Sequence, residues 1–94
     1  MKGRTHELKT WPEPFMDVAL GRKTFEVRKN DRDYRIGDTL KLMEYMPSED
    51  HYTGMWQLVL VTYVLRSKQI ANGNQFGIEP GYCIMSITRI GVDP

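Results

Sequence analysis

The sequence predicts one small α+β domain, with about five to six mostly antiparallel strands curled into a small β-barrel and one short helix near the N-terminus. The chain has 94 residues, and no repeat, linker or low-complexity segment divides residues 1–94 into more than one domain. Short segments rich in β-branched and aromatic residues are separated by glycine and proline. Strands and helices do not alternate as in parallel βαβ folds, and closure of a sheet removes exposed edges.

The N-terminal part of the chain predicts a strand followed by a helix. Residues 5–11 favour a strand, and Pro12 and Pro14 come next, where proline suits the first turn of a helix. Apolar residues then recur at helical spacing, and Gly21 is placed to end the helix. We therefore expect a short helix over residues 13–20.

The segment after this helix alternates in character with a period of two. Thr24, Glu26 and Arg28 alternate with Phe25 and Val27. In a strand, this pattern puts the polar side chains on one face and the apolar side chains on the other. We expect a strand here, with its apolar side chains in the core and its charged face outside the core.

Three further strands complete the predicted fold. Turn-forming residues at 30–33 precede a strand over 39–46. An aromatic and β-branched run predicts a strand over 56–65, and the last strand covers 82–90. Residues 66–81 have little periodicity, and we interpret them as a long loop that could cover a ligand.

The composition is that of a soluble globular domain. Thirteen Lys and Arg against twelve Asp and Glu give a net charge of +1. No window approaches the roughly 18 apolar residues of a transmembrane helix, and the first residues lack a signal-peptide pattern. The single Cys83 lies in an apolar run, which indicates a buried, inert thiol. We expect a cytoplasmic protein that does not associate with membranes.

Positive charge is concentrated in one segment. From Arg22 to Arg35 there are six cations and three anions, a local excess that the rest of the chain offsets. A basic patch favours binding of phosphate or nucleic acid. Arg32 and Arg35 are placed to reach phosphate oxygens, although a turn rich in Asp and Arg can also satisfy itself.

The densest polar group in the sequence surrounds Glu26. Arg28 can bind phosphate or a base edge through two parallel hydrogen bonds, and Lys23 offers a point charge. Glu26 can accept from the exocyclic amine of a base or orient the arginine. The same pattern also fits a solvated edge strand, in which Glu26 and Arg28 pair for at most about 1 kcal/mol. On the pattern alone, both interpretations stay open.

The sequence predicts no metal ion and no cofactor. His6 and Lys9 lie on opposite faces of the first strand if it is extended, and no other His, Cys or carboxylate has the spacing of zinc ligands. The chain also lacks a phosphate-binding P-loop, a dinucleotide fingerprint and a nucleophile elbow.

Several motifs in the first half of the chain resemble those of an ASCH-type domain, and more narrowly the DUF3850 group of small bacterial and phage proteins. They are His6-Glu7-Leu8-Lys9, Pro14-Phe15, Gly21 to Arg28, Asn30-Asp31-Arg32 and Ile36-Gly37-Asp38. The resemblance implies a PUA-like β-barrel with a cleft beside the early helix, and a role in binding RNA, a nucleotide or a modified nucleoside.

Residues of the resembled family can be placed on this sequence by their motifs. Lys23, Glu26 and Arg28 fall on the polar cleft motif of ASCH domains. His6, Lys9 and Asn30 match the narrower group. With Arg32, the residues expected to bind the ligand are therefore His6, Lys9, Lys23, Glu26, Arg28, Asn30 and Arg32.

Two other functions are kept as alternatives. Some ASCH relatives resemble amidohydrolases of acetylcytidine, which use a Lys, a Thr nucleophile in the next strand and a later Glu. Here Lys23 matches, Glu26 stands at the Thr position, and Thr24 lies two residues earlier, so catalysis would use Lys23 with Thr24 or Glu26. The third alternative is a protein-interaction or regulatory module whose polar strand face is merely solvated.

Overall fold

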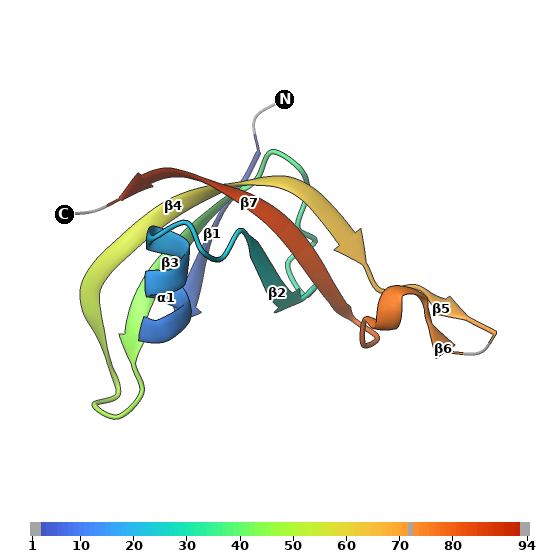
Figure 1. The fold of residues 1–94 in the computed structure, drawn as a ribbon, viewed down its shortest axis with the longest axis horizontal. Coiled ribbons are helices and arrows are strands. Elements are labelled where there is room, and N and C mark those ends of the chain that lie inside the picture. The colour runs from blue at the N-terminus through green and yellow to red at the C-terminus, as the bar shows by residue number, and fades with distance from the viewer. Residues whose placement is uncertain (1–2, 72, 93–94) are drawn as a thin grey trace.

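The structure is a computed structural model that describes residues 3–71 and 73–92. One curled five-stranded sheet dominates it, with the strand order β1-β3-β4-β7-β2 (Figure 1). These strands are β1 (Thr5–Thr10), β2 (Phe25–Lys29), β3 (Thr39–Met46), β4 (His51–Arg66) and β7 (Tyr82–Val92). β1 and β3 run parallel, and the other neighbours run antiparallel. The prediction of a small, mostly antiparallel, curled sheet is confirmed, but the predicted barrel does not close: the sheet is a half-barrel with β1 and β2 as its two edges.

One helix, α1 (Pro12–Ala19), packs against β3 under the arch formed by β4 and β7 (Figure 1). It begins one residue earlier than predicted, because Pro12 itself occupies the first turn. A hydrogen bond ties it to the sheet: the fully buried side chain of Gln57 donates from Nε2 to the carbonyl of Phe15 at 2.8 Å. No helix in the described part of the chain has the length and apolar character needed to cross a membrane.

The hydrophobic core lies between α1 and the side of the sheet that faces it. Alternate residues of β3, β4 and β7 point into it, as the period of a strand requires. Burial of one such side chain stabilises the fold by roughly 1.5–3 kcal/mol. The hydrophobic core consists of Leu8, Phe15, Val18, Tyr34, Leu40, Leu42, Val59, Val61, Val64, Cys83, Met85 and Ile87. The prediction that Cys83 is buried is confirmed, and burial raises the pKa of its thiol.

In strand β2, the polar face that carries Glu26 points towards the inside of the half-barrel, whereas the sequence predicted that this face points outward. Glu26 is only 2% exposed, whereas Phe25 is 46% and Val27 is 50% exposed. The alternation itself was read correctly, but the choice of the buried face was wrong. The reason is that β2 is an edge strand whose inner side meets the edge of β1, where free backbone carbonyls require hydrogen-bond donors.

Two segments contain more regular structure than predicted. β4 begins at His51 instead of residue 56, because the hairpin with β3 continues through the pair Tyr45 and Tyr52, whose rings pack edge to face at 5.2 Å. Within residues 66–81, β5 (Gln69–Ile70) pairs with β6 (Gly73–Asn74), and a 3₁₀ turn follows at Gln75–Gly77. This short hairpin projects away from the half-barrel (Figure 1).

Arginine side chains bridge the gap between the two edge strands, β1 and β2, and we call this gap the seam. Arg28 on β2 donates from Nη2 to the carbonyl of Lys9 at 3.0 Å. Arg32, in the loop after β2, donates from Nη1 to the carbonyl of Glu7 at 2.9 Å. These side chains satisfy backbone groups that a neighbouring strand would bind in a closed barrel.

Candidate functional site

A buried carboxylate between two cations forms the centre of the site. Lys23 Nζ contacts Glu26 Oε1, and Arg28 Nε donates to Glu26 Oε2 at 2.9 Å. The Glu26 side chain is 3% exposed, against 22% for Lys23 and 25% for Arg28. Both cations therefore reach the surface while the carboxylate that orients them does not. The three groups together carry a net charge of +1.

The turn between α1 and β2 sets the position of Lys23. Gly21 has a φ of +77°, a left-handed conformation that glycine adopts without steric cost. The backbone N–H groups of Arg22 and Lys23 both donate to the carbonyl of Asp17, at 2.9 and 3.0 Å. The end of α1 therefore brings Lys23 back towards β2, where it meets Glu26. The predicted helix-ending role of Gly21 is confirmed.

Hollows lie beside both cations. One of about 230 Å³ lies between the end of α1 and strands β4 and β7, and Lys23, Thr24 and Arg89 line it together with Val18 and Ile87. Another, of about 160 Å³, lies at the seam and includes Arg28 and Arg32 in its lining. We call Lys23, Glu26 and Arg28 the ion-paired group. It has a predominantly apolar hollow on one side and a polar hollow on the other.

Five of the predicted functional residues lie in or beside this site. Lys23, Glu26 and Arg28 are in direct contact, as predicted. Thr24 lines the same hollow as Lys23, and Arg32 lines the same hollow as Arg28. The remaining predicted ligand-binding residues, His6, Lys9 and Asn30, have other surroundings.

The side chains of Lys9 and Asn30 make contacts that do not involve the ion-paired group, although the backbone carbonyl of Lys9 accepts from Arg28. Lys9 is exposed, and its Nζ lies 4.1 Å from the centre of the Tyr45 ring, a favourable cation–π distance. It lies on the opposite face of β1 from His6, as the sequence predicted. Asn30 accepts through Oδ1 from the backbone N–H of Tyr34 at 3.2 Å, which shapes the loop after β2.

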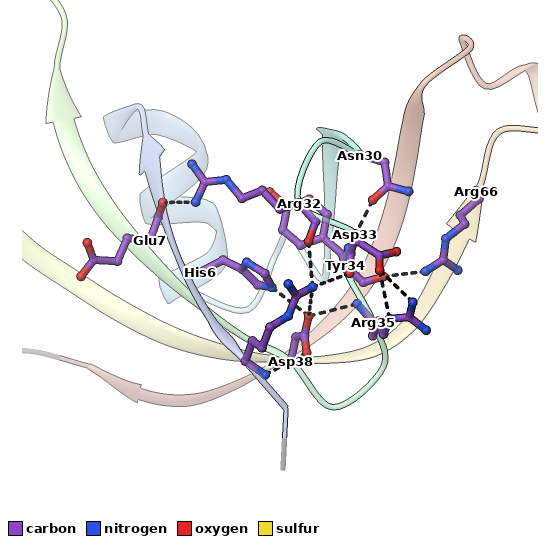
Figure 2. A network of polar contacts seen from close by, with 10 residues as sticks. His6, Glu7, Asn30, Arg32, Asp33, Tyr34, Arg35, Asp38 and Arg66 are labelled. Carbon is purple, nitrogen blue, oxygen red and sulfur yellow. Dashed lines mark hydrogen bonds and ion pairs between the residues drawn. The ribbon is translucent and has the colours of Figure 1, made fainter. Parts of the chain in front are cut away.

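His6 belongs to a second polar group, centred on the buried carboxylate of Asp38 (Figure 2). His6 Nε2 lies 2.8 Å from Asp38 Oδ2. The backbone N–H groups of Arg4 and Arg35 donate to the same carboxylate at 3.0 and 3.1 Å. The His6 ring also packs edge to face against Tyr34, with centroids 4.8 Å apart. Sequence reasoning missed this group, because Asp38 has the appearance of an ordinary turn residue in the sequence and lies 32 positions from His6.

Opposing effects determine the protonation of Asp38. Burial by itself raises the pKa of a carboxyl, but the hydrogen bonds from His6 and from the backbone N–H groups of Arg4 and Arg35 outweigh it. The pKa of Asp38 is therefore lowered from its ordinary value, and the group is a carboxylate at neutral pH. It holds the start of β1 next to the start of β3.

Arginines fix the loop between β2 and β3 from several sides (Figure 2). Arg4 Nη2 donates to the carbonyls of Arg32 and Asp33 at 2.8 and 2.7 Å. Arg66 Nη2 donates to the carbonyl of Tyr34 at 2.6 Å. Arg35 pairs with Asp33 at the surface, at 2.7 Å. These contacts constrain the loop that carries Arg32 and the backbone beside the seam.

The segment predicted to cover the ligand lies on the other face of β2. Phe76 and Glu79 line a hollow together with Val27 and Ile84, on the side of the strand away from Glu26. Among the described residues of 66–81, none lines the hollow beside Lys23 or the hollow at the seam. Among the described residues, no three His, Cys, Asp or Glu side chains gather where they could hold a metal ion.

Comparison with known proteins gives a family but no function. A search of curated proteins found no match to this chain. The family model described as "Domain of unknown function (DUF3850)" matches residues 5–87, which covers β1, β2, β3 and β4 and the first six residues of β7, and includes both buried carboxylates. This chain therefore belongs to the DUF3850 family.

Proposed function

We propose that this domain binds RNA or a nucleotide-like ligand beside α1, through Lys23, Glu26 and Arg28, on a barrel of the PUA-like, ASCH type. One observation carries the proposal: a buried carboxylate orients two cations whose outer parts stay accessible. Such cations are already ordered, so a ligand gains their hydrogen bonds with little further loss of side-chain freedom. A solvated ion pair would instead leave all three side chains exposed, whereas Glu26 is 2% exposed.

The surroundings of the cations also suit a nucleotide. The hollow at the end of α1 combines apolar walls, Val18 and Ile87, with the polar groups of Lys23, Thr24 and Arg89. A base needs an apolar enclosure and a few directed polar groups, whereas a phosphate needs charge-assisted donors. Arg28 and Arg32 on the other side of Glu26 supply such donors.

The proposal is tested by measuring the affinity of a labelled single-stranded RNA by fluorescence anisotropy at several salt concentrations. Lys23→Ala should weaken binding by at least about tenfold and reduce the slope of log K against log salt by about one. The matched control is Lys41→Ala, which removes the same charge from the outer side of β3, where Lys41 lies 4.7 Å from the Trp56 ring. Urea unfolding of both variants shows whether each remains folded.

Equal affinities for wild type and Lys23→Ala, or no binding by the wild type at low salt, would contradict the proposal. The nature of the natural ligand is found separately. The protein is purified under native conditions, and mass spectrometry identifies any nucleotide or RNA that remains bound.

A second candidate function, hydrolysis of the amide of an acetylated nucleoside, has one observation in its favour. Thr24 and Lys23 line the same hollow, where a hydroxyl and an amine could act as nucleophile and base. Against it, the Lys23 amine is already bonded to the carboxylate of Glu26. The test is release of acetate from acetylcytidine. Activity that is absent in wild type, or unchanged in Thr24→Ala, rejects this function.

A further inference from the structure

We propose that the polar hollow at the seam is a phosphate site. Its volume is about 160 Å³, and it is lined by Leu8, Arg28, Lys29, Asp31, Arg32 and Tyr34. Three cations face one anion there, so the lining favours an oxyanion. As the phosphate subsite of a nucleotide ligand, it rests on the proposed function, and it extends the ligand from Lys23 past Arg28 to the loop after β2.

The two guanidinium groups are held in place and still have donors to spare. Arg28 uses Nε for Glu26 and Nη2 for the carbonyl of Lys9 and the hydroxyl of Thr10. Arg32 uses Nη1 for the carbonyl of Glu7. Among the described residues, none binds Arg28 Nη1 or Arg32 Nη2. Fixed guanidinium groups with free N–H bonds suit the tetrahedral oxygens of phosphate.

The backbone of β2 adds a donor at the same place. The N–H of Ile87 donates to the carbonyl of Thr24, and the N–H of Asn30 donates to the carbonyl of Gly81. With the register of β2 and β7, these bonds place the N–H groups of Glu26 and Arg28 towards β7. In an antiparallel pair, the backbone N–H groups of the residues between these point away from the partner strand. Lys29 is one of these residues, so its N–H faces the open edge of β2, beside the hollow that Lys29 lines.

Tyr34 supplies a neutral donor. Its ring is buried in the core at 1% exposure, and the residue also lines the hollow. Burial raises the pKa of its phenol, an effect that exceeds the opposite influence of Arg32 and Arg28. The hydroxyl therefore stays protonated at neutral pH and can donate a hydrogen bond to a phosphate oxygen.

The simplest probe is inorganic phosphate, titrated by isothermal calorimetry into the intact protein. Arg32→Ala should weaken phosphate binding by at least about tenfold. The matched control is Arg35→Ala, which removes the same charge three residues away, from a side chain that pairs with Asp33 at the surface; it should change the affinity less than about twofold. Because Arg32 is exposed and makes one hydrogen bond, its loss leaves the protein folded.

A pair of ligands that differ only by the phosphate group sharpens the test. We expect cytidine 5′-monophosphate to bind wild type about tenfold or more tightly than cytidine, and we expect this ratio to fall to about one in Arg32→Ala. Arg35→Ala should keep the wild-type ratio. Tyr34→Phe should lower the ratio by a smaller factor, because it removes one neutral donor.

The outcomes separate this inference from the proposed function. RNA and cytidine could bind while the ratio of the affinities for cytidine 5′-monophosphate and cytidine is close to one in wild type, or is unchanged in Arg32→Ala. In that case the seam is not the phosphate site and the proposed function still stands. If inorganic phosphate binds in an Arg32-dependent way but neither cytidine nor RNA binds, the phosphate site stands and the proposed function fails. Absence of saturable phosphate binding overturns the inference.

Discussion

Two carboxylates in this domain are equally buried, and their partners differ in kind. Asp38 and Glu26 are both 2% exposed. Asp38 is bound by two backbone N–H groups and a buried histidine. Among the described residues, the partners of Glu26 are the side chains of Lys23 and Arg28, each about a quarter exposed. Fixed donors make Asp38 a part of the scaffold, whereas Glu26 orients groups that a ligand can still reach.

This difference indicates where a buried charge contributes to folding and where it contributes to binding. Backbone donors cannot leave Asp38 without displacement of the chain just before β1 and of the loop between β2 and β3, which carry Arg4 and Arg35. Lys23 and Arg28, the cations that bind Glu26, are held by side-chain contacts and keep their outer parts accessible to a ligand. Burial of a carboxylate is therefore a weak indicator of function, and the identity of its donors is a stronger one.

The largest effect is expected from Asp38→Ala, which leaves two backbone N–H groups and His6 without their acceptor. Unsatisfied buried groups of this kind cost about 3 kcal/mol in total, measured as the free energy of unfolding in urea. RNA affinity of the folded fraction should not change. The control is Asp33→Asn, in a side chain 59% exposed, for which we expect almost no change in the free energy of unfolding. Equal losses in both variants would remove the distinction between scaffold and surface.

A smaller loss of stability, about 1–2 kcal/mol, is expected from Glu26→Gln. The cost is limited because Lys23 and Arg28 can reach solvent once the carboxylate is gone. Affinity for RNA should respond more strongly than stability: two cations released from their partner should make the salt dependence of binding steeper. If Glu26→Gln destabilises the protein as much as Asp38→Ala and leaves binding unchanged, Glu26 is a scaffold residue too.

The smallest effect is confined to acid pH. The pKa of Asp38 is lowered in the folded protein from its ordinary value of 3.8, so the unfolded chain takes up this proton at a higher pH. The stability that Asp38 contributes is present above that value and is lost as pH falls below it towards the folded pKa. Urea midpoints measured across this range should therefore fall less steeply in Asp38→Asn than in wild type.

Asp33 accounts for part of the pH dependence of the urea midpoint that remains in Asp38→Asn. Its pKa is also lowered, chiefly by the hydrogen bond from Arg35. An acid slope that is identical in wild type and Asp38→Asn would show that the Asp38 carboxylate does not stabilise the fold.

The sequence predicted the local structure of this domain better than its long-range contacts. The strand at 39–46 is as predicted, and the helix is displaced by one residue, because spacing, proline and glycine act over a few positions. The parallel pairing of β1 with β3 could not be foreseen, because it depends on where the chain returns after β2. The same limit applies to the contact of His6 with Asp38.

The candidate site was found for a local reason, and its orientation was missed for a non-local one. Lys23, Glu26 and Arg28 lie within six positions, so the strand period places the last two on one face. Which face is buried depends on the edge of β1, whose carbonyls of Glu7 and Lys9 accept from Arg32 and Arg28. A pattern of period two cannot carry that information.

The seam has a mechanical consequence. A closed barrel resists widening, because each pair of strands is joined by a continuous row of backbone hydrogen bonds. Here the last gap is spanned by two long side chains, Arg28 and Arg32, whose rotatable bonds let the gap change its width while every strand pairing stays intact. The width of the seam is therefore set by the reach of two arginines and not by a row of backbone hydrogen bonds.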